Sequence, residues 1–155
     1  MRKISVLLIA IMVLCLFGCG NRNSNPIKDM SSCDLIYVTN GNTGDLFYIS
    51  EEEIDVRLGS ASENDKTHSA NTNKEDLFTY IKEVVNGLEF KSVDLEESTG
   101  WTYRITFMNE DKEIQGITFK GDQTCYIDSR DYEITKNGEE LKKLFECFDA
   151  IEITE

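Results

Sequence analysis

Residues 101–107 read WTYRITF, and this stretch decides the expected fold. Its large apolar side chains recur at every second position, at Trp101, Tyr103, Ile105 and Phe107. Polar residues occupy the positions between them. A period of two is typical of a β-strand that buries one face, because successive side chains point to opposite sides of a sheet. The stretch therefore predicts a strand with one face toward a core.

Neighbouring runs on either side continue this pattern. Residues 90–95 precede the strand, and residues 114–120, 124–128 and 132–134 follow it. Short segments rich in Asn, Asp, Gly and Ser separate the later runs, and these residue types favour tight turns. Sequential short strands joined by such turns predict an antiparallel meander.

A β-hairpin is predicted nearer the start of the chain. Residues 35–38 (LIYV) and 46–49 (LFYI) flank the sequence NGNTG at 40–44, which is typical of a tight turn with positive φ. Both strands are apolar on both faces, whereas a half-solvated strand alternates. We therefore expect the hairpin to lie centrally in the sheet. The alternative is an exposed interaction surface that includes Tyr37 and Phe47.

Two amphipathic helices complete the expected fold. Apolar residues recur at helical spacing within residues 77–88 and 141–148. The sequence TNKE at 72–75 matches a capping box, and Asn137 is placed to cap the second helix. The predicted fold class is therefore α+β, with a largely antiparallel sheet (hairpin plus meander) and both helices packed on one face. Residues 34–155 are expected to form this single domain.

Few residues point to catalysis. The only histidine, His68, lies in a polar run at 59–71 that we expect to be a loop, which would not hold it beside a nucleophile. Cys33, Cys125 and Cys147 lack paired metal-ligand spacing. We expect them to be buried thiols, with a single disulfide as the alternative. No catalytic residue, cofactor or metal ion is predicted.

Clusters of carboxylates make hydrolase activity an alternative function. The clusters are Glu51–Glu53, Asp94 with Glu96 and Glu97, and Asp128 with Asp131. Two facing carboxyl groups are the usual machinery of glycoside hydrolysis. Each cluster is more simply a solvated rim beside a strand or turn.

The chain is strongly acidic. It has 29 Asp and Glu residues against 16 Lys and Arg residues, which gives a formal net charge of −13. Nucleic-acid binding depends on Lys and Arg residues that neutralise phosphates, so no nucleic-acid partner is predicted. The net negative charge is compatible with a divalent cation or a cationic peptide as a partner.

The first nineteen residues predict a membrane anchor. Arg2 and Lys3 precede an apolar run at 4–17, which as a helix would span roughly 21 Å, less than the roughly 30 Å of a bilayer core. A basic start with a short apolar core is typical of a signal peptide. The run ends in LFGC at 16–19, which resembles the signal of bacterial lipoproteins.

This resemblance implies that the chain is cut after residue 18 and that Cys19 carries lipid. Residues 1–18 would be the signal peptide, and residues 19–33 the lipidated cysteine and a flexible tether. Two acyl chains hold a protein stably at a bilayer, whereas one holds it only marginally. The chain as a whole resembles small lipoproteins of Gram-positive bacteria that carry domains of unknown function, and this likeness implies no catalytic residues.

We therefore expect a membrane-anchored extracytoplasmic lipoprotein that acts as a non-enzymatic interaction module of inhibitor, immunity or accessory type. Its expected partners are the bilayer, through Cys19, and another extracytoplasmic protein. Binding hot spots favour Trp, Tyr and Arg. The candidate interaction residues are Trp101, Tyr103, Arg104, Tyr37 and Phe47. An envelope hydrolase and a lipoprotein that binds cations or cationic peptides are the alternatives.

Overall fold

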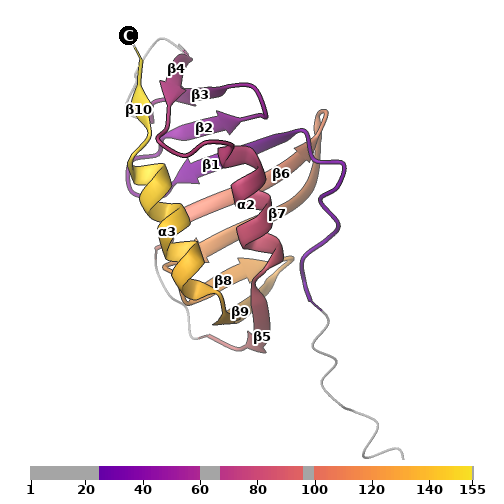
Figure 1. Cartoon of the computed structure of the whole chain (residues 1–155). Helices are drawn as coiled ribbons and strands as arrows, with labels where there is room; N and C mark the ends of the chain where they lie inside the picture. The colour runs from indigo at the N-terminus through magenta and orange to yellow at the C-terminus, as the bar shows by residue number, and fades with distance from the viewer. Residues whose placement is uncertain (1–24, 60–66, 96–99, 155) are drawn as a thin grey trace, which may run out of the picture.

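The computed structural model describes residues 25–59, 67–95 and 100–154. These residues form two layers, an antiparallel sheet of ten strands and two helices that lie together on one of its faces (Figure 1). The strand order is β10-β4-β3-β2-β1-β6-β7-β8-β9-β5. The predicted α+β class, with its antiparallel sheet and two helices, is confirmed. The predicted signal peptide and Cys19 lie outside the described residues.

The bounds of the elements follow the predicted runs closely. The strands are β1 (Leu35–Asn40), β2 (Leu46–Ile49), β3 (Ile54–Arg57), β4 (His68–Asn71), β5 (Glu89–Val93), β6 (Tyr103–Asn109), β7 (Lys112–Lys120), β8 (Thr124–Ile127), β9 (Arg130–Lys136) and β10 (Glu152–Ile153). The helices are α2 (Leu77–Asn86) and α3 (Gly138–Asp149). β1 pairs with β2 on one side and β6 on the other, so the hairpin is central, as predicted.

The core lies between the sheet and the two helices. The ring of Phe145 on α3 packs against Tyr103 and Phe119 from the sheet, with centroid distances of 4.8 and 5.5 Å. The Tyr103 hydroxyl donates a hydrogen bond to Asp149 at the end of α3. Burial raises the pKa of Tyr103, and the hydrogen bond to Asp149 raises it further. One aromatic cluster therefore joins α3 to the middle of the sheet.

The predicted loop at 59–71 is wrong in its last four residues. His68–Asn71 form β4, which pairs with β3 and, on its other side, with β10 from the end of the chain. Residues 60–66 lie outside the described part of the chain. A polar segment becomes a strand here because two neighbours complete its backbone hydrogen bonds, which local sequence does not reveal.

The predicted capping box at 72–75 is also wrong. α2 begins after Asp76, whose carboxylate accepts a hydrogen bond of 3.0 Å from the Thr79 amide. Thr72 Oγ1 instead accepts from the Lys74 amide at 3.2 Å in the connection that precedes the helix. At α3 the residue before the helix is Asn137, as predicted, but its side chain donates to the Gly87 carbonyl rather than accepting from the helix.

Residues 25–33, which we call the strap, pack against the domain. Met30 is only 2 % exposed and Cys33 is also buried. The buried side chain of Gln115 in β7 accepts from the Lys28 amide at 2.9 Å and donates to the Pro26 carbonyl at 2.8 Å. The expected tether reached residue 33, whereas residues 25–33 pack against the domain. The domain therefore includes the strap.

Candidate interaction surface

The sheet face that points away from α2 and α3 is the main candidate surface, and we call it the open face. Alternation along each strand brings Tyr37, Tyr48, Arg104 and Tyr126 to this face, opposite the core side chains. The pairing registers agree, because Tyr37 lies opposite Tyr48 and Arg104 lies opposite Thr118, which in turn lies opposite Tyr126. Among the described residues no helix lies on the open face (Figure 1).

Aromatic side chains occupy the open face on both sides of β6. The Tyr37 and Tyr48 rings meet edge to face, with centroids 5.2 Å apart and planes at 75°. Such pairs are favourable beyond their buried area and hold both rings in fixed positions. Tyr126, on β8, is 41 % exposed. These tyrosines offer apolar area with a polar tip and little rotational freedom to lose on binding.

Cations on the open face are paired with carboxylates from other strands. Three ion pairs join Arg104 to Glu113 (3.7 Å), Lys120 to Asp131 (2.8 Å) and Lys91 to Glu133 (3.9 Å). Arg104 also donates to Thr118 Oγ1 at 3.1 Å. This part of the open face is therefore locally balanced in charge, although the chain carries a net charge of −13.

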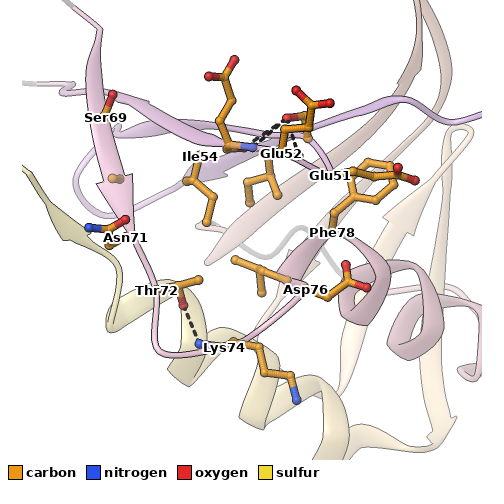
Figure 2. A pocket seen from close by; sticks show the side chains of 14 residues that line it. Glu51, Glu52, Ile54, Ser69, Asn71, Thr72, Lys74, Asp76 and Phe78 are labelled. Atoms are coloured by element: carbon orange, nitrogen blue, oxygen red, sulfur yellow. Dashed lines mark hydrogen bonds between the residues drawn. The ribbon is translucent and has the colours of Figure 1, made fainter.

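A second candidate site is an acidic cleft of about 340 Å³ between the β2–β3 turn and the segment that leads into α2 (Figure 2). The acidic residues that line it are Glu51, Glu52, Glu53 and Asp76. The one lysine in its wall, Lys74, extends over the ring of Tyr80, with Nζ 3.8 Å from the ring centroid. The turn is held by Ser50 Oγ, which accepts from the amides of Glu52 and Glu53.

Comparisons of the chain with protein-family models, curated proteins and solved structures found no match.

The structure separates the predicted interaction residues into two groups. Tyr37 and Arg104 lie on the open face. Tyr103 and Phe47 were wrongly predicted as interaction residues, because they are 2 % and 7 % exposed and face the helices. Tyr103 and Arg104 are adjacent in a strand, so the two side chains cannot share one face.

Trp101 lies just before β6 and is 39 % exposed. Its backbone and ring pass close to Gly41 in the β1–β2 turn, where a Cβ would come within 2.2 Å of the Trp101 carbonyl oxygen. Only glycine fits at this contact. Trp101 is thus available at the end of the sheet and is held there by the hairpin turn.

Sequence reasoning missed Tyr48 and Tyr126 as surface residues. The signal for Tyr126 was present, because it alternates with the buried Cys125 and Ile127 in β8. Tyr48 gave a weaker signal, since all four residues of β2 are large and apolar or aromatic and do not reveal which face is buried.

Within the described residues, no group of three His, Cys, Asp or Glu side chains is placed to hold a metal ion. None of the described helices is long and apolar enough to cross a membrane. Cys33, Cys125 and Cys147 are free thiols, with the first two buried and the third partly buried.

Alkaline pH is expected to destabilise the fold through Cys125. Burial raises the pKa of this thiol from 9.0 to about 12. Its contribution to stability is therefore complete below pH 9 and is lost as the pH rises toward 12. We expect the free energy of unfolding to fall by about 1.4 kcal/mol per pH unit in this window from this group alone. Urea unfolding of the wild type and of Cys125→Ala from pH 8 to 11 measures the effect.

The control is Cys147→Ala, which removes a less buried thiol. The variant that lacks Cys125 should show the shallower pH dependence, whatever constant loss of stability its smaller side chain causes. Parallel pH profiles for the wild type and Cys125→Ala would contradict the assignment.

Proposed function

We propose that the chain is a lipid-anchored extracytoplasmic protein that serves as a non-enzymatic interaction module for another folded protein. The proposal rests on the composition of the open face. It combines tyrosines held by ring packing with an arginine held by Glu113 and Thr118. Aromatic residues and arginine are enriched at the centres of protein interfaces, where unpaired charges are depleted.

The dimensions of the sheet suit such a partner. Ten strands at about 4.8 Å spacing give a surface roughly 40 Å wide. A standard protein interface covers about 800 Å² on each partner, which this width accommodates. The module would act by occupying or holding a partner at the cell surface, as an inhibitor, immunity protein or accessory protein does.

The anchored location is supported by residues 1–19. The basic start, the short apolar run and LFGC at 16–19 resemble a lipoprotein signal. A lipid anchor confines the module to the surface on which its partner would lie, and this raises the effective concentration of the module there.

Site-specific photocrosslinking in intact cells tests the proposal. The full chain carries a photoreactive phenylalanine in place of Tyr37 or Tyr126 on the open face, or in place of the exposed Lys142 on α3. We expect one discrete adduct from both open-face positions and none from position 142. Purified partner should then bind Tyr37→Ala at least tenfold more weakly than the wild type. Equal adducts from all three positions, or none from any, would contradict it.

The acidic cleft supports a second candidate function, binding of a cationic peptide. Glu51, Glu52 and Asp76 outnumber the single lysine in its wall. A labelled oligolysine peptide separates the two functions, because Glu51→Gln with Glu52→Gln would weaken its binding to the purified chain and leave the open-face adducts unchanged.

Of the carboxylate clusters that would serve a hydrolase, Glu51–Glu53 line the acidic cleft, whereas Asp128 and Asp131 form a cluster that contacts lysines. Asp128 pairs with Lys28 at 3.3 Å and Asp131 with Lys120 at 2.8 Å, so both members of that cluster are engaged in ion pairs. Glu96 and Glu97 lie outside the described residues.

A further inference from the structure

The first described residue of the strap lies beside the outermost strand of the sheet. Asn25, the first described residue, lines a small hollow together with Leu88, Glu89, Phe90 and Thr135. Glu89 and Phe90 belong to β5, which forms one edge of the sheet. In Figure 1 the strap, coloured indigo, runs past α2 toward this end of the sheet. We call the β5 edge, with β9 beside it, the tether pole.

The acidic cleft lies toward the opposite edge. The segments 41–59, 67–76 and 150–154 carry β2, β3, β4 and β10, and we call them the acidic pole. They contain eight Asp and Glu residues against only Arg57 and Lys74. Eight strand spacings separate β4 from β5, which corresponds to roughly 35–40 Å across the sheet.

Charges at the tether pole are largely paired. Lys136 contacts Glu89 at 2.6 Å and Lys91 contacts Glu133 at 3.9 Å. Lys28 of the strap contacts Asp128 at 3.3 Å. The acidic pole thus carries half of the net negative charge of the described residues, and it lies at the edge of the sheet opposite Asn25.

The connection to a lipid at Cys19 would be short. Only residues 20–24 lie between Cys19 and Asn25, and the six steps from residue 19 to residue 25 span at most about 22 Å when fully extended. This length holds the tether pole near the headgroups. An anionic membrane surface attracts basic groups and repels acidic ones within about one Debye length. The acidic pole is therefore driven away from the bilayer, while the paired charges of the tether pole are tolerated there.

We propose that the domain stands on the membrane on its β5 edge, with the acidic pole pointing outward. This inference rests on the lipid anchoring in the proposed function. The open face is then roughly perpendicular to the membrane plane. Its protein partner therefore approaches parallel to the membrane rather than along the membrane normal. The acidic cleft is presented at the greatest distance from the bilayer, where it meets cationic groups in solution first.

Energy transfer to a labelled membrane tests this orientation. The full, lipidated chain in a Cys147→Ser background receives a donor dye at Lys91→Cys in the tether pole or at Ser69→Cys in the acidic pole. The protein is reconstituted into vesicles of phosphatidylglycerol and phosphatidylcholine with a headgroup acceptor. We expect transfer from position 91 to be at least threefold more efficient than from position 69. Equal or reversed efficiencies in protein that floats with the vesicles would overturn the orientation alone.

Flotation itself is the separate readout for the anchor. If the full chain carries no acyl chain and does not float, the proposed function fails and the inference fails with it. Two variants then test the causes of the orientation. Glu51→Gln with Glu52→Gln and Glu53→Gln should reduce the threefold difference, whereas Glu139→Gln with Glu146→Gln on α3 should leave it unchanged. An identical effect of both sets would show that the charge of the acidic pole does not set the orientation.

Discussion

Replacement of Phe145 by alanine is expected to lower the free energy of unfolding by about 3–5 kcal/mol, the range measured for large aromatic truncations in protein cores. Phe145 is 8 % exposed, and its ring contacts Tyr103, Phe119 and Phe148. The substitution would leave a cavity at the point where α3 joins the sheet. Since a typical domain is stable by only about 5–15 kcal/mol, a large share of the stability would be lost. Urea unfolding followed by circular dichroism measures it.

The matched control is Lys142→Ala, on the exposed side of the same helix. It should change the free energy of unfolding by less than about 0.5 kcal/mol, as is usual for surface positions. A loss below about 1 kcal/mol for Phe145→Ala would mean that α3 is not held through this aromatic cluster.

Replacement of Gln115 by leucine is expected to release the strap. The side chain amide is the partner of both the Pro26 carbonyl and the Lys28 amide, and leucine satisfies neither. A buried backbone group left without a partner costs about 1–3 kcal/mol, which gives about 2–6 kcal/mol for two groups. These two are only partly buried, so we expect a loss near the lower end of that range while the strap stays packed. The strap would detach because both backbone groups can then form hydrogen bonds with water. Its detachment would expose Met30.

Hydrogen exchange reports this release directly. The Lys28 amide should exchange at least a hundredfold faster in Gln115→Leu than in the wild type, because its hydrogen bond is lost. The control is Gln123→Leu, which makes the same chemical change at an exposed position. If the Lys28 amide stayed protected in Gln115→Leu, the strap would be held by Met30 and Cys33 rather than by Gln115.

Local patterns in the sequence determine most of the fold. The alternation in WTYRITF predicted β6, and the helical stripes predicted α2 and α3, because these elements bury one face each. Trp101, which the same alternation placed on the core face, lies before the strand and is 39 % exposed. The fully apolar hairpin strands predicted a central position, which the pairing of β1 with β6 confirms. In each case the burial pattern of a single segment carries the information.

The failures involve partners that are distant in sequence. β4 is polar, and its second neighbour, β10, lies about eighty residues later in the chain. Met30 and Cys33 are isolated apolar residues in a polar segment, and their burial depends on Gln115 in β7. No local pattern in the sequence marks such contacts.

The candidate surface was predicted only in part, for a related reason. Residue type alone indicated Tyr103 together with Arg104, but adjacent strand residues point to opposite sides. The side that α2 and α3 cover decides which of the two is accessible, and this depends on how the helices pack across the whole sheet. Tyr37 lies on the open face although its strand is central, because its neighbours Ile36 and Val38 are the residues that face the core.

The edge of the sheet formed by β10 is a poor partner for another strand. β10 is only two residues long, Glu152–Ile153, and one of these carries a negative charge. A short, charged edge is a common protection against edge-to-edge pairing, because it offers too few backbone groups to hold an incoming chain. A strand from a second molecule would therefore find too few backbone partners at β10 to pair with it. Polymerisation through this edge is disfavoured even at high protein concentration.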